Sequence, residues 1–287
     1  MDRSRVAVVT DSTISLPDDV RGQLHIYSVP HELLVNGRTY RDGVDISSTE
    51  FYRLLTESPQ PPKTSAPPPA SFLEVFVKAS LHTKMVLCLC LASRLSSTYY
   101  SACTAADLAR ERVPGVELRV VDTGTAGTAL GLVALECARA AERGAGLDEL
   151  AQLASRLADR VYFVAFLETL YYVWRGGRIP KVALWAGNLL NVKPLLELRG
   201  GEVRMVERPR SRARARERLL AYLERHGGAG PLHVAVMHAH AMEEANELVE
   251  EIRGRFNCTE LFLSEFTPVM GAHTGPGLLG LAFLSEA

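Results

Sequence analysis

The chain has 287 residues, about twice the length of a typical single domain, so we expect two domains. Its 32 Lys and Arg residues are balanced by 33 Asp and Glu residues, whereas binding to nucleic acid through phosphate contacts calls for a basic excess. We find no apolar run near the roughly 20 residues that span a bilayer, and no signal-peptide pattern at the N-terminus. These features argue against nucleic-acid binding, secretion and membrane insertion, and predict a cytoplasmic protein.

The five cysteines support this location, because they are odd in number and scattered through apolar runs. Two of them, Cys88 and Cys90, alternate within one run and are predicted to share a face of a strand. No second cysteine pair or close histidine completes a zinc site, so we expect neither a metal nor a cofactor. We interpret all five as small buried apolar residues, namely Cys88, Cys90, Cys103, Cys137 and Cys258.

The first half of the chain alternates between short apolar strands, polar loops and helices. Strands are predicted at 5–9, 84–91 and 117–121, and helices from about 17 and at 51–55, 70–80, 99–112 and up to about 143. This alternation predicts a doubly wound α/β domain with a parallel sheet, which we assign to residues 1–158.

Two stretches interrupt that alternation. A β-like segment at 26–34 is followed by Asn36-Gly37, a strong signal for a hairpin turn into residues 38–40. A proline-dense connector at 59–69 is predicted to be an extended, stiff loop, because proline lacks the N–H group that a sheet needs.

The second half has a different order of predicted helices and strands. A helix is predicted at about 147–159, followed by strands at 161–166, 194–197, 203–206, 233–238, 260–265 and 278–284, with a basic helix after 206 and another at 242–254. Because hairpins and helices are mixed here, we expect an α+β domain with a mixed or antiparallel sheet at residues 159–287.

Hydroxyl side chains gather where strands of the first domain end. They belong to Thr10, Ser12 and Thr13 (with Asp11 between them), to Thr64 and Ser65 in the proline connector, and to Ser93, Ser96, Ser97 and Thr98. Ligands of doubly wound sheets bind outside the carboxyl ends of the strands, so these groups predict a cup without a fixed cation that holds a carboxylate or a phosphoryl group. The alternative is that they cap helices and form turns, which Ser, Thr and Asp favour whatever the function.

Two glycine-containing segments are further candidates. The segment Gly271–Gly277 would present His273 from a tight loop, unless it is only a surface turn. The glycines before Arg178 could place its guanidinium group beside an anion, although a glycine stop at a helix end is the commoner explanation.

Basic residues and histidines elsewhere give weaker signals. Six arginines occupy alternate positions from Arg208 to Arg218, and we interpret them as solvated surface, because a spacing of two scatters residues around a helix. His238 and His240 would share one strand face and His233 lies nearby, but no carboxylate completes a metal-binding pattern. Motifs of serine hydrolases, NTPases and dinucleotide-binding proteins are absent from the sequence.

In their order and spacing, six segments spread over the whole chain resemble the DegV family, a bacterial family of fatty-acid-binding proteins. The segments are Val9-Thr10-Asp11-Ser12-Thr13, Lys63-Thr64-Ser65-Ala66-Pro67, Leu95-Ser96-Ser97-Thr98-Tyr99, Gly176-Gly177-Arg178-Ile179, Gly187-Asn188-Leu189-Leu190-Asn191-Val192-Lys193-Pro194 and His273-Thr274-Gly275-Pro276-Gly277.

The resemblance implies a carrier whose apolar tunnel encloses one long-chain fatty acid and which catalyses no reaction itself. It implies that the carboxyl group meets Thr64, Ser96 and His273, and that Arg178 lies on a cationic rim facing a partner kinase. The kinase would phosphorylate the carboxyl group to an acyl phosphate for phospholipid synthesis. Supporting positions around the carboxyl group would be Asp11, Ser12, Ser65, Ser97 and Thr98.

Two residues depart from the family pattern. Pro68 stands where the family often has serine, and Ser97 stands where it has glycine. If the second position requires a positive φ, Ser97 is strained and the geometry around the carboxyl group differs.

Two other functions stay open on the sequence alone. With Ser96 as nucleophile, His273 as base and Asp11 as orienting group, the protein would be a hydrolase or acyltransferase. A regulatory protein that binds a small phosphoester would use the same cup of hydroxyl groups.

Overall fold

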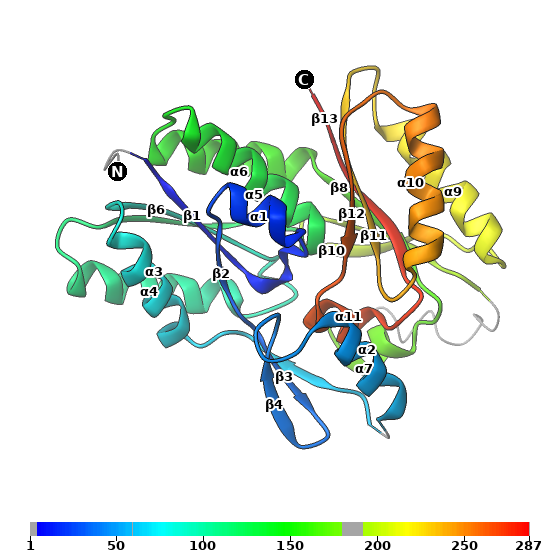
Figure 1. Cartoon of the computed structure of the whole chain (residues 1–287), viewed down its shortest axis with the longest axis horizontal. Coiled ribbons are helices and arrows are strands. Elements are labelled where there is room, and N and C mark those ends of the chain that lie inside the picture. The colour runs from blue at the N-terminus through cyan, green and yellow to red at the C-terminus, as the bar shows by residue number, and fades with distance from the viewer. Residues whose placement is uncertain (1–4, 59, 180–191, 287) are drawn as a thin grey trace.

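The computed structural model describes residues 5–58, 60–179 and 192–286. Figure 1 shows two large sheets side by side, with a small third sheet at one end of the molecule. In these ranges, no helix has both the length and the apolar character needed to cross a membrane. The fold is mixed α/β, with one parallel and one mixed sheet, as the sequence predicts.

The first large sheet is parallel, with its strands in the order β2-β1-β6-β7. These are β1 (Ala7–Asp11), β2 (Tyr27–Val29), β6 (Met85–Cys90) and β7 (Glu117–Asp122). Helices α3 (Pro69–Ser80) and α4 (Thr98–Arg112) cover one face, while α5 (Gly127–Glu142) and α6 (Leu147–Arg160) cover the other. Both faces are buried, which explains why β1 and β6 are continuous apolar runs.

Two short helices follow β1 at the carboxyl edge of this sheet. The 3-10 helix η1 (Ser12–Ile14) is capped by the Asp11 side chain, which accepts a hydrogen bond from the Thr13 N–H. Helix α1 (Asp18–Gln23) begins after Pro17 with two acidic residues in its first turn, as its sequence predicts.

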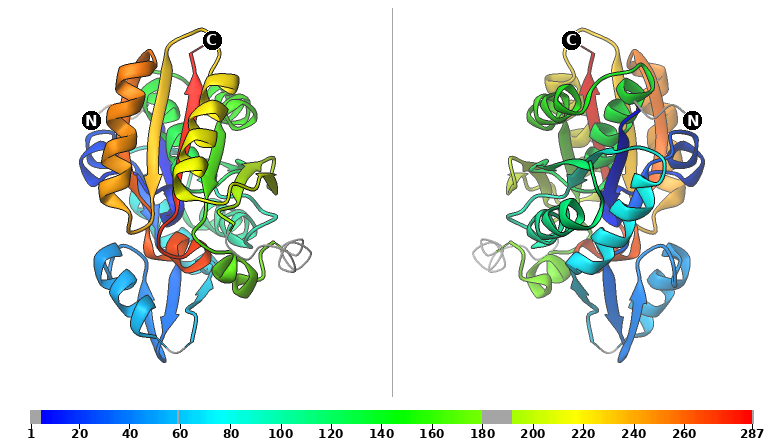
Figure 2. Two further views of the ribbon diagram at one scale, coloured as in Figure 1. Left: turned by 90° about the vertical axis from the view of Figure 1, so that its right-hand side faces the viewer. Right: turned by 90° about the vertical axis from the view of Figure 1, so that its left-hand side faces the viewer.

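The second large sheet has the order β10-β9-β8-β13-β11-β12, in which β11 and β12 are parallel and the other neighbours antiparallel. Its strands are β8 (Tyr162–Phe166), β9 (Leu195–Arg199), β10 (Glu202–Glu207), β11 (Leu232–His238), β12 (Cys258–Glu265) and β13 (Leu279–Ser285). Helices α9 (Arg212–His226) and α10 (Met242–Arg255) cover its outer face, as Figure 2 shows. The predicted hairpin after residue 194 is confirmed as β9–β10.

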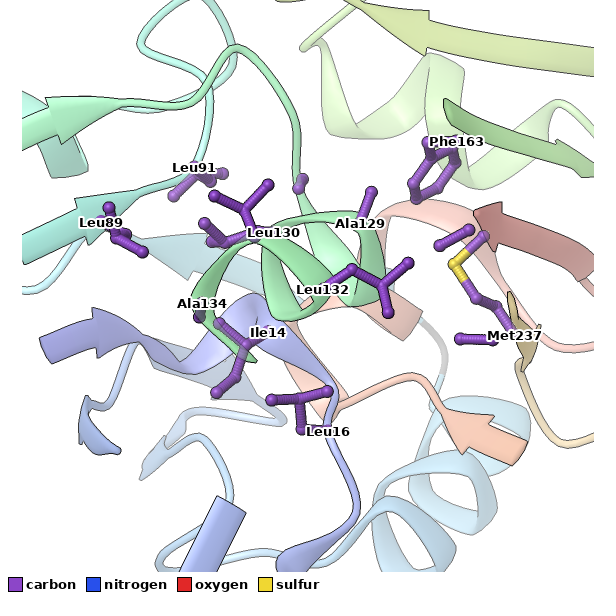
Figure 3. Close-up of a cluster of buried hydrophobic side chains, with 14 of the residues drawn as sticks. Ile14, Leu16, Leu89, Leu91, Ala129, Leu130, Leu132, Ala134, Phe163 and Met237 are labelled. Atoms are coloured by element: carbon purple, nitrogen blue, oxygen red, sulfur yellow. The ribbon is translucent and has the colours of Figure 1, made fainter. Parts of the chain in front are cut away.

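Helix α5 lies between the two sheets and is buried along nearly its whole length. Figure 3 shows Leu130 on the side of Leu91, just beyond β6, and Leu132 on the side of Met237 in the second sheet. All four side chains belong to one continuous apolar cluster, so burial of this helix fixes the position of one sheet against the other.

The third sheet is antiparallel in the order β4-β3-β5 and corrects two expectations. Its strands are β3 (Glu32–Val35), β4 (Arg38–Arg41) and β5 (Lys63–Ser65), and helix α2 (Ser48–Glu57) lies between β4 and β5 in the chain. The β3–β4 hairpin is confirmed, but residues 26–34 form two strands in different sheets, with Pro30 between them. Residues 63–65 are not loop, because they pair with β3.

The strands of the parallel sheet precede residue 158, and those of the six-stranded sheet follow it. We therefore retain residues 1–158 and 159–287 as proposed domains, with α5 contributing to the core that joins them.

The cysteines follow the prediction in part. Cys88, Cys90 and Cys137 are buried, and the Cys88 and Cys90 Sγ atoms lie 3.8 Å apart on one face of β6. Cys103 and Cys258 are only partly buried, because Cys103 lies on α4 near the surface and Cys258 begins the edge strand β12.

Candidate functional site

A cavity lies between the start of α5 and the inner face of the six-stranded sheet. It holds about 970 Å³ of space not filled by protein atoms, a volume that includes open solvent at its mouth. Its walls are largely apolar and include Leu91, Leu95, Ala126, Phe163, Ala165, Leu196, Leu198, Val203, Val269, Met270 and Leu278. An apolar chain could therefore be buried here along most of its length.

The alternation of side chains along β8 and β9 builds the floor of this cavity. Phe163 pairs with Leu198 and Ala165 pairs with Leu196 across the two strands, so all four side chains point to the same face. Gly280 of β13 pairs with Ala165 on the other side, and a Cβ atom there would lie 2.5 Å from the Ala165 Cβ. Because alanine and glycine are among the smallest residues, no long side chain fills the cavity at this point.

Polar side chains meet at one end of the cavity. Thr64 comes from β5 and His273 from helix α11 (Pro268–Thr274), and the Thr64 Oγ1 atom lies 2.8 Å from the His273 Nε2 atom. Ser96, from the loop between β6 and α4, lines the same cavity, but its Oγ atom bonds to Thr98 Oγ1 at 2.8 Å. The structure thus brings the three predicted carboxyl-binding residues to one cavity, with a direct bond between two of them.

His273 lies in a helix, whereas the sequence predicts a tight loop. Gly275 ends this helix with a φ of 73° and marks its end, whereas Gly271 lies inside the helix, so the two do not form a turn around the histidine. Burial lowers the pKa of His273 to about 4, and the nearby Arg178 and His31 contribute in the same direction. The imidazole is therefore neutral near pH 7, and its Nδ1 atom has no hydrogen-bond partner in the described part of the chain.

The glycines before Arg178 end a helix, as the commoner explanation predicts, and also leave room for His273. Helix α7 (Tyr171–Gly176) ends at Gly177, whose φ of 67° is typical of a glycine stop. A Cβ atom on Gly176 would lie 2.6 Å from His273 Nδ1, so this glycine lets the imidazole approach closely. Arg178 then donates to the Gly176 carbonyl at 2.7 Å and to the Thr64 carbonyl at 3.5 Å. The exposed Arg178 lines this cavity, so the hydroxyl cup that was expected to lack a fixed cation has one beside it, at the residue for which the family resemblance implies a cationic rim.

Sequence reasoning missed two buried residues behind Ser96. The Thr98 hydroxyl lies 3.0 Å from His31 Nε2, and His31 Nδ1 lies 3.3 Å from the Ser12 hydroxyl, which donates to Asp42 Oδ2 at 2.6 Å. Burial lowers the pKa of His31 and raises the pKa of Asp42 to about 7. The only sequence signal was the polarity of both residues beside apolar strands, which is common at strand ends.

The other predicted supporting residues have different surroundings. Asp11 accepts hydrogen bonds from the Thr13 hydroxyl at 2.5 Å and the Leu91 N–H at 2.8 Å, and so joins the ends of β1 and β6. Ser65 donates to Glu32 at 3.3 Å at the edge of the cavity. Ser97 is exposed at the start of α4 and is not among the residues that line the cavity.

The two departures from the family pattern cause little strain. Ser97 has a φ of −76°, so its side chain meets no left-handed backbone. Pro68 precedes α3 with a φ of −68°, which proline favours, but it provides no side-chain cap for that helix. A serine cap at this position would be worth about 1 kcal/mol.

The arginine run forms ion pairs and is in part less exposed than the solvated surface that the sequence predicts, since the Arg212 and Arg216 side chains are only 28% and 26% exposed. Arg212 pairs with Glu168 and Glu244, and Arg216 pairs with Glu247 and Glu251 across the α9–α10 contact.

The histidines elsewhere differ from one expectation. His233 bonds to Glu260 at 3.1 Å, whereas His240 lies beyond β11 with a φ of 51° and shares no strand face with His238. Among the described residues, no three His, Cys, Asp or Glu side chains group closely enough to hold a metal ion. Of the DegV-like segment at 187–194, residues 187–191 lie outside the described residues.

Fold and cavity together define an α/β protein in which an apolar pocket ends at hydroxyl and imidazole groups. A family model described as an uncharacterised protein of the DegV family matches residues 5–286. A DegV domain-containing protein of Streptomyces coelicolor is 36% identical over 283 residues, covering 98% of this chain and 99% of the relative. The chain belongs to the DegV family.

Solved structures of relatives share the whole fold. A DegV family protein from Thermus thermophilus, described as binding fatty acid, superposes with a TM-score of 0.91 at 32% identity, covering 98% of this chain and 100% of that one. DegV of Bacillus subtilis, described as a fatty acid binding protein, has a TM-score of 0.89 at 27% identity, covering 98% and 99%.

Proposed function

We propose that this protein binds one long-chain fatty acid in the cavity, with the carboxylate at Thr64, Ser96 and His273. The observation that carries the proposal is that one cavity combines largely apolar walls with the hydroxyl and imidazole groups of Thr64, Ser96 and His273. The fatty-acid binding described for relatives with the same fold supports it. We propose no metal or cofactor besides this ligand.

Burial of the acyl chain supplies the main driving force. Each buried methylene contributes about 0.8 kcal/mol, so about 14 methylenes contribute roughly 11 kcal/mol. Lost translational and conformational freedom offsets about 4–15 kcal/mol of this, which leaves a ligand that can be bound tightly and still be released.

The carboxylate requires hydrogen-bond donors, because burying it without partners costs several kcal/mol. Neutral His273 can donate from Nε2 to the Thr64 oxygen, which leaves the Thr64 hydrogen free for the carboxylate. The Ser96 hydroxyl is the second donor at this end of the cavity. Arg178 at the mouth adds a positive charge that favours the anionic form.

We propose further that Arg178 forms part of the surface where a partner kinase docks and phosphorylates the carboxylate. This role rests on the exposure of its guanidinium group beside the Thr64 carbonyl. The protein would then act in the cytoplasm, where ATP is available to the kinase, and would present its ligand without catalysing a reaction.

The contacts of the site give no support to a serine hydrolase. Ser96 bonds to Thr98, and His273 bonds to Thr64, so each candidate catalytic group has a different partner. A nucleophile requires a base within hydrogen-bond reach.

Mass spectrometry of the purified protein tests the binding proposal. After denaturation and extraction, we expect about one fatty acid per chain, or loading to that level after incubation with fatty acids. Protein that carries no lipid in either preparation would contradict the proposal.

A further inference from the structure

A continuous chain of hydrogen-bonding groups leads from the polar end of the cavity into the protein. It runs from the Ser96 hydroxyl to Thr98 at 2.8 Å, to His31 Nε2 at 3.0 Å, from His31 Nδ1 to Ser12 at 3.3 Å, and to Asp42 Oδ2 at 2.6 Å. Ser96 is half-buried beside the cavity, while the other four residues are at most 7% exposed. Buried polar groups of this kind are normally hydrogen-bonded, and these four meet that need largely through one another.

Backbone N–H groups leave the hydrogen bonds of this series only two possible donor-to-acceptor directions. The His31 N–H donates to the Ser12 oxygen at 3.0 Å, and the Thr98 N–H donates to the Ser96 oxygen at 3.3 Å. Each hydroxyl has one hydrogen, and a neutral imidazole carries a hydrogen on one nitrogen only. All hydrogens in the chain must therefore point either toward Asp42 or toward Ser96.

The ionisation of Asp42 selects the direction. An ionised carboxylate only accepts, so Ser12 donates to Asp42, His31 donates from Nδ1, and Ser96 donates to Thr98. The Ser96 oxygen then offers the cavity a lone pair and no hydrogen. When Asp42 is protonated, every bond reverses, both lone pairs of Ser96 are occupied by Thr98, and the Ser96 hydrogen points into the cavity.

We propose that Asp42 and His31 form a proton relay that turns the Ser96 hydroxyl into a donor for the bound carboxylate. This inference rests on the proposed function. A neutral fatty acid entering the cavity donates its proton to the Ser96 oxygen, and each hydrogen in the chain shifts across one hydrogen bond. His31 exchanges its Nδ1 hydrogen for one on Nε2, and the last proton settles on Asp42. One O–H bond of the acid is lost and one O–H bond of Asp42 is gained, so atoms and charge balance. A carboxylate that binds from water draws the same proton from solvent.

The groups around Asp42 allow it to be the one member of this hydrogen-bonded series that changes its protonation state. Asp11 faces it from the end of β1, and its negative charge favours the protonated form. Tyr52 faces it from α2, and burial raises the pKa of Tyr52 well above 10, with Glu265 acting in the same direction. The Val269 N–H of α11 donates to Asp42 Oδ1 at 3.1 Å and leaves Oδ2 for Ser12. Burial keeps His31 in its neutral form by lowering its pKa.

Asp42→Asn tests the relay without disturbing its shape. The amide oxygen of asparagine can accept from the Val269 N–H, and its NH₂ group can donate to Ser12, which fixes the chain in the donor direction. Thr98→Val breaks the chain but leaves the Asp42 charge in place. Asp45→Asn is the matched control, because Asp45 lies three residues further along and pairs with Arg41 at the surface.

Calorimetric titration with sodium laurate and sodium oleate, in buffers of different ionisation enthalpy, counts the protons taken up on binding. For the natural protein and Asp45→Asn, we expect close to one proton at pH 8.5, almost none at pH 6, and an affinity that falls up to tenfold per pH unit above pH 7. For Asp42→Asn and Thr98→Val, we expect no uptake and an affinity independent of pH.

The outcomes separate the relay from the binding proposal. Failure of both ligands to bind the natural protein at any pH would refute the proposed function. Binding without proton uptake in the natural protein would refute the relay alone. Uptake that persists in Thr98→Val would also refute it, since charge repulsion between Asp42 and the ligand would then suffice.

Discussion

Replacing Thr64 with valine removes one hydroxyl from the carboxylate end of the cavity, together with the hydrogen-bond partner of His273 Nε2. Valine keeps the branched shape and suits β5, so the strand should form as before. The lost group lies 2.8 Å from His273 Nε2 and is the proposed donor to the carboxylate. A hydrogen bond to a charged group contributes about 1.5–3 kcal/mol, so the dissociation constant should rise about 10- to 150-fold.

Calorimetric titration with a fatty acid and with its methyl ester isolates this contribution. The ester retains the acyl chain but lacks the charge, so its affinity should change much less than that of the acid. Ser65→Ala is the control, because Ser65 is the next residue on β5 and donates to Glu32 instead. Equal weakening of acid and ester by Thr64→Val would show that this hydroxyl does not contact the carboxylate.

Three further substitutions test other parts of the account. Ala165→Leu adds three carbon atoms to the cavity floor. If these atoms displace three methylenes of the ligand, the fatty acids with the longest acyl chains should lose about 2.4 kcal/mol of binding free energy. Unchanged selectivity for chain length would place the acyl chain elsewhere. Arg178→Ala should lower acyl phosphate formation by the partner kinase about tenfold and leave the fold intact, and full activity would remove Arg178 from the docking surface. The pKa of His273 is about 4 in the folded protein and 6.5 in the unfolded chain. Below pH 6.5, the unfolded state therefore binds more protons than the folded state. Unfolding by urea should therefore show a loss of about 2 kcal/mol by pH 5 that His273→Gln lacks, and equal losses in both proteins would contradict the burial of this imidazole.

Much of the architecture could be predicted from local sequence patterns. The apolar runs at β1 and β6 predict strands that are buried on both faces, and the hydroxyl residues after them meet because parallel strands end at the same edge of a sheet. Asn36-Gly37 fixes the β3–β4 hairpin, since both residues adopt the positive φ that its turn requires. In each case a few neighbouring residues determine the outcome.

Contacts between distant residues decided the rest. Lys63–Ser65 becomes a strand only because β3 offers an edge to it, and this pairing brings Thr64 to His273, 209 residues further along the chain. In the sequence, Asp42 and His31 look like ordinary polar residues, and only in the folded protein do groups of η1, α4 and α11 bond to them. Periodicity tells which face of an element is buried, but not what packs against that face, and here the tertiary contacts determine the hydrogen bonds on which the site depends.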